Sequence, residues 1–172
     1  MGISAYVDTD VAGCKATRRS TSGGVALYGT HTVKHRSKTQ TTVCLSSGEA
    51  ELRGIGDGLA QALGLQSIAR DLGMTWRIDM HTDATAAIGI ACRLGMGQIK
   101  HLDVTDLWIQ EKLNSKLAYL HKVLGTENPA DIFTKYTDRA ILNVALGKMS
   151  MHYVDGRSDV APAAMGTTAN SQ

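Results

Sequence analysis

The sequence predicts an α/β protein in which a five-stranded mixed sheet is flanked by helices. Three strand-like stretches follow one another near the N-terminus with short turns between them, which is typical of an antiparallel meander. Beyond them, helical patterns alternate with two further strand patterns, so the expected order is βββαβα(α)βα. Strands that alternate with helices favour parallel additions to the same sheet. At 172 residues, the chain has the length of one domain.

The N-terminal half supplies three strands and one long helix. The strands are expected at Ile3–Val11, Gly24–Tyr28 and Thr32–Arg36, with an extension through Thr42–Leu45 left open. A polar, basic loop is expected over Gly13–Ser22. The helix begins at Ser46, continues with apolar residues near helical spacing to about Leu72, and ends at Gly73, a position that favours a left-handed cap. Glycines inside this helix weaken it, but small residues also permit a close approach to a sheet.

The C-terminal half supplies two strands, two short helices and a final helical region. Strands are expected at Trp76–Thr82 and Lys116–Val123, and helices at Ala84–Leu94 and Leu102–Leu113. Because Pro is favoured in a first helical turn, Asn128–Pro129 is expected to open the last helical region. That region runs to about Met149, with an interruption near Tyr136–Thr137. The remaining residues are polar and small, so we expect a domain over 1–150 and a disordered tail over 151–172.

Composition favours a soluble intracellular protein. Apolar residues make up 43% and charged residues 20% of the chain, which is ordinary for a globular domain. No apolar run reaches the ~18 residues of a membrane span, and no signal-peptide pattern is visible at the N-terminus. Three cysteines without close pairing indicate a reducing compartment, although cytoplasm and nucleus are not distinguished. We expect a monomer that does not bind membranes.

Positive charge is concentrated in one segment, although the net charge is only +2. Between Val11 and Gly48 there is no Asp or Glu, and this basic segment contains six cations: Lys15, Arg18, Arg19, Lys34, Arg36 and Lys38. Such a segment is suited to contacts with nucleic-acid phosphates. A solvated hairpin surface has the same pattern. Charge alone leaves both interpretations open.

Two carboxylates stand at the start of the long helix. Ser46 followed three residues later by Glu49 is a capping-box pattern, which predicts a structural role for Glu49. Glu51 has no part in the cap and points elsewhere around the helix. It is therefore free to bind a metal ion or to exchange a proton.

Three further acids stand at the ends of expected elements. Asp8 lies within the first strand, Asp83 follows the fourth strand, and Asp131 follows the Pro of the last helical region. If the first and fourth strands are neighbours, these acids and Glu51 meet over the same strand ends. Four carboxylates repel one another unless divalent cations such as Mg²⁺ bind between them. For each acid alone, surface solvation or helix capping remains the alternative.

The motifs of the chain resemble those of the ribonuclease H domain of copia-type LTR-retrotransposon polyproteins. The resemblance covers roughly residues 4 to 136, and its motifs occur in the order of that family. They are Tyr6–Gly13, Thr17–Gly23, Ser37–Gln40, Leu45–Glu51, His81–Asp83, Lys100–Asp103 and Thr126–Lys135. Each motif is weak by itself, whereas the ordered set is specific.

The resemblance implies a ribonuclease H-like fold and a nuclease that hydrolyses the RNA strand of RNA–DNA hybrids. The four metal-binding acids of the family correspond to Asp8, Glu51, Asp83 and Asp131. They are expected to bind two Mg²⁺ ions, for which Mn²⁺ can substitute, and the products are expected to be a 3′-hydroxyl and a 5′-phosphate. A reverse transcriptase domain of the parent polyprotein is an expected partner. Residues expected to bind substrate are Arg18, Arg19, Ser22, Lys38, Gln40, Lys100 and His101.

The chain departs from the family at several positions that affect substrate packing and support of the metal ligands. Val11 and His35 stand where the family has Trp, Cys14 replaces an acid, and Ala84 follows Asp83 where the family has Asn. Two other functions therefore stay open: a catalytically weak or inactive hybrid-binding module, and a DNA-cutting relative with the same fold. The sequence also leaves two acids undecided between a site role and a local capping role, namely Asp10 and Asp103.

Overall fold

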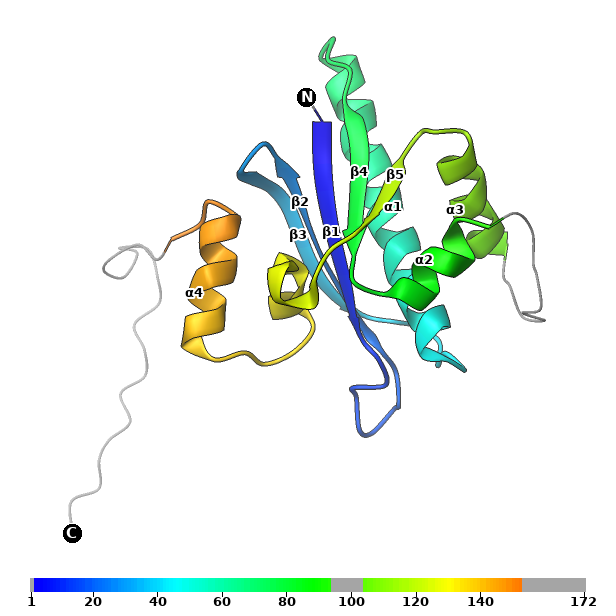
Figure 1. Ribbon diagram of the computed structural model, residues 1–172, viewed down its shortest axis with the longest axis vertical. Helices are drawn as coiled ribbons and strands as arrows, with labels where there is room; N and C mark the ends of the chain where they lie inside the picture. The colour runs from blue at the N-terminus through cyan, green and yellow to red at the C-terminus, as the bar shows by residue number, and fades with distance from the viewer. Residues whose placement is uncertain (1, 94–103, 153–172) are drawn as a thin grey trace.

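The computed structural model describes residues 2–93 and 104–152, and it forms a five-stranded sheet with helices on both faces (Figure 1). The strands are β1 (Gly2–Asp10), β2 (Thr21–Tyr28), β3 (His31–Thr39), β4 (Arg77–Thr82) and β5 (Tyr119–Lys122). The α-helices are α1 (Ser47–Asp71), α2 (Thr85–Ala91), α3 (Val104–Asn114) and α4 (Arg139–Lys148). Two 3₁₀ turns complete the described chain: η1 (Gly125–Glu127) and η2 (Pro129–Phe133).

The sheet has the strand order β3-β2-β1-β4-β5. The first three strands pair antiparallel, and β4 and β5 are added parallel to β1. This confirms the predicted mixed sheet, with its antiparallel meander and its parallel additions. Because β1 is central and parallel to β4, the C-terminal ends of these two strands lie at the same edge of the sheet.

Two clusters of buried residues cover the two faces of the sheet. The larger one joins β1 and β4 to α1, α2 and α3 through Ile3, Ile55, Met80, Ala87 and Ile109. The smaller one joins β2 to α4 through Val25, Leu27, Ala145 and Met149, with the apolar side chains of η2 packed against it. Across residues 2–93 and 104–152, no helix is both long enough and apolar enough to cross a membrane.

Glycines of α1 allow the helix to approach β1 closely, as expected from the sequence. A Cβ on Gly54 would lie 2.5 Å from Oγ1 of Thr9, and one on Gly58 would lie 2.4 Å from Cγ1 of Val7. The helix ends as predicted, because Gly73 adopts a φ of +76°. Its N–H donates to the carbonyl of Arg70, and the following N–H of Met74 donates to that of Ala69, which satisfies the last carbonyls of the helix.

Three element predictions were wrong in detail. The segment Thr42–Leu45 is not a strand, because its polar groups bond to the start of α1. β2 begins at Thr21, inside the segment predicted to be a loop. The last helical region is not continuous: η2 ends where the hydroxyl of Thr134 bonds to the carbonyl of Asp131, and α4 starts only after Asp138 caps it.

Candidate metal centre

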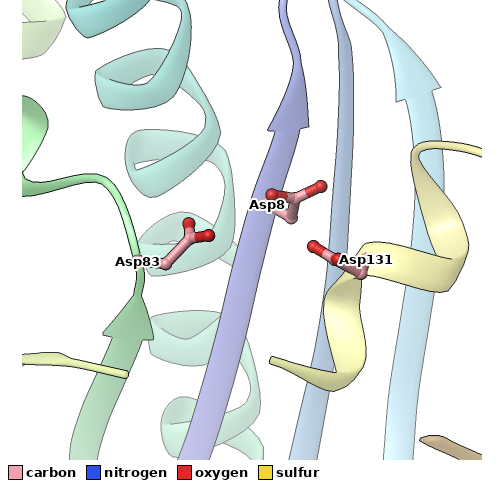
Figure 2. Close-up of side chains that lie close together, drawn as sticks. All are labelled: Asp8, Asp83 and Asp131. Atoms are coloured by element: carbon pink, nitrogen blue, oxygen red, sulfur yellow. The ribbon is translucent and has the colours of Figure 1, made fainter. Parts of the chain in front are cut away.

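Three aspartates from distant parts of the chain converge at one edge of the sheet. Asp8 lies near the end of β1, Asp83 follows the last residue of β4, and Asp131 lies in η2. One carboxylate oxygen of each lies within 4.8 Å of the others. Figure 2 shows Asp83 and Asp131 on either side of Asp8, with their carboxylates directed toward it. The parallel pairing of β1 and β4 brings the first two together, and the packing of η2 adds the third.

η2 is held against β1 and β2 by residues that the sequence analysis did not single out. Nδ2 of Asn128 donates to the carbonyl of Val7 over 2.9 Å. Gly23 pairs with Asp8 across the β1–β2 ladder, and a Cβ there would lie 2.6 Å from Cγ2 of Thr134. The hydroxyl of Thr134 donates to the carboxylate of Asp8. These residues belong to quoted motifs, but no local pattern indicated that they would meet.

Glu51 lies next to the three aspartates, although its carboxylate is not among the oxygens within 4.8 Å of one another. Its pKa is raised to about 8, chiefly by burial and then by the charges of Asp8 and Asp83. A hydrogen bond from Thr9 and the charge of Lys135 oppose this rise. The structure therefore brings three of the four predicted ligands together, and places the fourth within their electrostatic field.

Asp131 and Lys135 form an ion pair at the rim of the cluster. Burial raises the pKa of the Asp131 carboxyl, as do the charges of Asp8 and Asp83, while Lys135 lowers it. The Lys135 Nζ lies 3.0 Å from Oδ2 of Asp131. The other oxygen, Oδ1, is buried and has no hydrogen-bond partner among the described residues. The sequence analysis quoted Lys135 within a motif but gave it no role.

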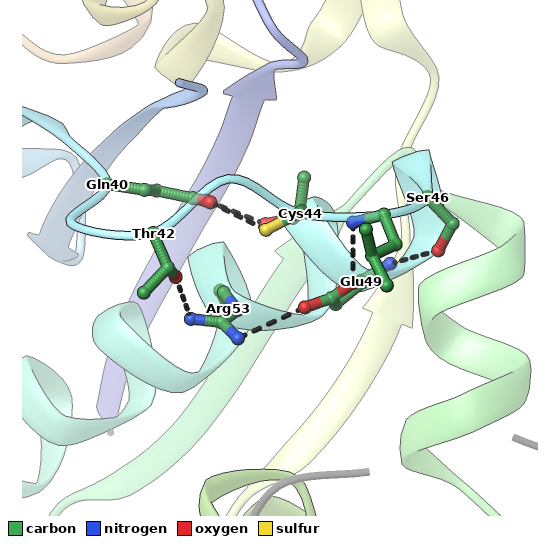
Figure 3. A network of polar contacts seen from close by, with 8 residues as sticks. Gln40, Thr42, Cys44, Ser46, Glu49 and Arg53 are labelled. Atoms are coloured by element: carbon green, nitrogen blue, oxygen red, sulfur yellow. Dashed lines mark hydrogen bonds and ion pairs between the residues drawn. The ribbon is translucent and has the colours of Figure 1, made fainter. Parts of the chain in front are cut away.

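The start of α1 is fixed by a polar network in which Glu49 has a structural role (Figure 3). Oγ of Ser46 accepts from the N–H of Glu49 over 3.2 Å, as the capping box predicts. The carboxylate of Glu49 accepts from the N–H of Leu45 over 2.8 Å, and not from that of Ser46. It also pairs with Arg53 over 3.0 Å, and Arg53 donates to the hydroxyl of Thr42. Glu49 is therefore occupied within the cap, in contrast to Glu51.

Two of the residues predicted to bind substrate are buried instead. The side chain of Gln40 donates to Oγ of Ser22 and to the carbonyl of Ala50, each over 2.8 Å. Ser22 is 0% and Gln40 7% exposed. Because Ala50 precedes Glu51, these bonds tie the start of α1 to β2 and leave neither side chain on the surface for substrate.

The basic segment is largely exposed, as a phosphate-binding surface requires. Arg18 and Arg19 lie exposed in the loop between β1 and β2, and Lys38 lies exposed near the end of β3. Arg36 is an exception, because it is half-buried and pairs with Asp57 of α1 over 3.2 Å. Two other predicted substrate residues, Lys100 and His101, lie outside the described residues, as does Asp103.

Three other positions from the sequence analysis have local packing roles. Asp10 lies against the turn after β1, where a Cβ on Gly13 would meet its Oδ2 at 1.7 Å. His35, at one of the Trp positions of the resembled family, stacks on Phe133 with ring centroids 5.4 Å apart. His81 stacks between Tyr6 and His121 in the sheet, which matches the strand-packing role that its spacing suggested.

Sequence relatives of the chain are polyproteins of retrotransposons, while no family model matches it. It is 27% identical over 152 residues to the retrovirus-related Pol polyprotein from transposon TNT 1-94 of Nicotiana tabacum. It is likewise 27% identical over 142 residues to the Pol polyprotein from transposon RE1 of Arabidopsis thaliana. These matches cover 87% and 81% of this chain, but only 11% and 10% of the relatives. The chain thus spans about a tenth of the length of these Pol polyproteins.

Solved structures with the same fold are ribonuclease H domains. The N-terminal RNase H domain of Rv2228c from Mycobacterium tuberculosis matches with a TM-score of 0.52 and 19% identity, covering 85% of this chain and 96% of that one. LC11-RNase H1, solved in complex with an RNA/DNA hybrid, matches with a TM-score of 0.52 and 14% identity, covering 77% and 93%. The chain therefore has the ribonuclease H fold and is related to the Pol polyproteins of copia-type retrotransposons, which confirms the resemblance that its motifs indicated.

Proposed function

We propose that the protein is a metal-dependent endonuclease that hydrolyses the RNA strand of RNA–DNA hybrids. The observation that supports this most directly is the convergence of Asp8, Asp83 and Asp131, with oxygens within 4.8 Å, beside Glu51. The fold adds support, since a neighbour with this fold was solved with an RNA/DNA hybrid. We further propose that the chain acts as part of a Pol-type polyprotein, next to a reverse transcriptase domain, as its relatives suggest.

The residues of the cluster fit a hard divalent cation. They offer only carboxylate oxygens, the ligands that Mg²⁺ and Mn²⁺ favour over softer nitrogen or sulfur donors. Oδ1 of Asp131 is buried without a hydrogen-bond partner among the described residues, so one ligand atom is available. The charges of Asp8 and Asp83 raise the pKa of Glu51, after burial, which shows an excess of negative charge. A cation in this cluster relieves that excess.

Asp8, Asp83 and Asp131 would hold the cations, with Glu51 as the fourth acid. When bound, two divalent cations supply an activated water and stabilise the leaving oxygen of the phosphodiester. Thr134 orients the carboxylate of Asp8 by its hydrogen bond. Glu51, with a pKa of about 8, holds a proton at neutral pH and releases it when positive charge arrives. The expected products are a 3′-hydroxyl and a 5′-phosphate.

Substrate recognition in this proposal depends on the nucleic-acid backbone. Arg18, Arg19 and Lys38 are exposed cations and are suited to contacts with phosphates, which are independent of base sequence. The 2′-hydroxyls of the RNA strand distinguish it from DNA. We therefore expect cleavage with little sequence preference.

A cleavage assay with a matched pair of variants tests this function. An end-labelled RNA–DNA hybrid, single-stranded RNA and duplex DNA are each incubated with Mg²⁺, Mn²⁺ or EDTA. The hybrid alone should be cut, and only with a divalent cation. Asp83→Asn should abolish cutting, whereas Asp79→Asn, in the same strand but paired with Arg77 and His121, should not. Hybrid binding without cleavage would favour an inactive binding module, and cleavage of duplex DNA would favour a DNA-cutting enzyme.

A further inference from the structure

Lys135 faces the acidic cluster, although it belongs neither to the four acids nor to the basic segment. Its Nζ lies 3.0 Å from Oδ2 of Asp131. Burial lowers the pKa of the Lys135 amine, but the hydrogen bond to Asp131 and the charges of Asp8, Asp131 and Asp83 raise it by more. One ammonium group therefore interacts with the same three carboxylates that converge at the candidate metal centre.

The turn after η2 defines the position of Lys135. The N–H of Lys135 donates to the carbonyl of Asp131 over 3.3 Å. The hydroxyl of Thr134 lies 3.0 Å from that carbonyl and also donates to the carboxylate of Asp8. Two consecutive residues thus contact two different acids of the cluster. Backbone geometry therefore places the ammonium, which is unlike an ordinary surface lysine.

The charges of the cluster are not balanced by Lys135 alone. Three carboxylates face one ammonium, and the excess negative charge contributes to the raised pKa of Glu51. A divalent cation balances this excess better than an ammonium does. It would also repel the ammonium, because like charges a few Å apart interact strongly even where solvent penetrates. A cation that binds Asp131 must therefore displace Lys135 or bind more weakly beside it.

We propose that Lys135 is a resident countercharge that stabilises the carboxylate cluster without a divalent cation and competes with that cation for Asp131. This inference rests on the proposed function, because it requires that the cluster binds divalent cations. The competition lowers the affinity of the site for metal. In return, the fold tolerates three neighbouring carboxylates when no metal is bound. Lys135 is in this sense a positioning residue for metal binding.

Metal titration of Lys135→Met tests the inference without relying on activity. Lys148→Met is the matched control, because Lys148 is exposed and donates only to the carbonyl of Thr126 among the described residues. Mn²⁺ is titrated into each protein by calorimetry. Lys135→Met should bind Mn²⁺ about three- to tenfold more tightly than wild type, since an ion pair is lost and a repulsion removed. In EDTA it should melt about 2–4 °C lower, and Mn²⁺ should reverse that loss.

The controls separate this inference from the proposed function. Lys135→Arg keeps the charge and should bind Mn²⁺ as wild type does. If Lys135→Met does not melt cooperatively in EDTA, the milder Lys135→Gln is titrated in its place. Equal or weaker Mn²⁺ affinity in the neutral variant than in Lys148→Met would overturn the competition while leaving the metal site intact. A wild-type protein that binds no Mn²⁺ would overturn the proposed function, and the competition with it.

Discussion

Glu51→Gln should stabilise the metal-free protein at alkaline pH and abolish hybrid cleavage. The pKa of Glu51 is raised from 4.5 to about 8, so the folded state binds this proton more tightly than the unfolded state. Wild-type stability should therefore fall as pH rises from about 5 to 8, as Glu51 ionises among other carboxylates. Gln resembles the protonated acid and does not ionise, so its advantage should appear only at the alkaline end of this window.

The size of the effect follows from the pKa and the exposure of Glu51. Full ionisation of a group with this pKa costs up to about 5 kcal/mol. Because Glu51 is only partly buried, solvent screening reduces that figure to about 2 kcal/mol. For a domain of this size, such a gain raises the melting temperature by about 4–8 °C. At pH 5 the two proteins should melt within about a degree of each other.

Thermal melting in EDTA at pH 5 and pH 9 measures this gain, and hybrid cleavage with Mg²⁺ at pH 8 measures activity. Glu49→Gln is the matched control, because Glu49 bonds to Leu45 and Arg53 within the helix cap. It should lose only tenths of a kcal/mol, roughly the strength of such a cap contact, and should keep nearly full activity. Cleavage by Glu51→Gln should fall by orders of magnitude. The four-acid site would be refuted if Glu51→Gln cut hybrid as fast as Glu49→Gln, or melted alike at both pH values relative to wild type.

Three further predictions concern the basic segment, the buried amide and the tail. Hybrid binding should lose about 0.7–0.9 in log–log salt slope per phosphate contact when exposed cations are neutralised at Arg18, Arg19 and Lys38. Arg36→Ala, which removes a paired cation, should leave the slope unchanged, and equal effects would assign the segment to a solvated surface. Gln40→Leu should lower urea-unfolding stability by about 2–3 kcal/mol, because it removes buried hydrogen bonds, and a wild-type midpoint would contradict that role. Deleting residues 155–172, which are polar and rich in small residues, should leave melting and cleavage unchanged; a loss of several degrees would show that the tail packs on the domain.

Local sequence patterns were sufficient to predict the fold class and the order of its elements. Alternation and helical spacing depend on residues near one another in the chain, so the strands and helices were located to within a few residues. The same holds for the cap at Ser46 and the left-handed Gly73. The four acids also came from local position, because each stands at or near the end of an expected element.

Contacts between distant segments were decided only by the tertiary structure. Thr134 donates to Asp8 across 126 positions, and Asn128 to Val7 across 121. No periodic pattern encodes such a pair, because it depends on how closely η2 can approach β2. For the same reason the structure, and not the sequence, assigned Lys135 to the acidic cluster and Gln40 to the interior. A local pattern determines which side of an element a residue occupies, whereas packing determines what lies opposite it.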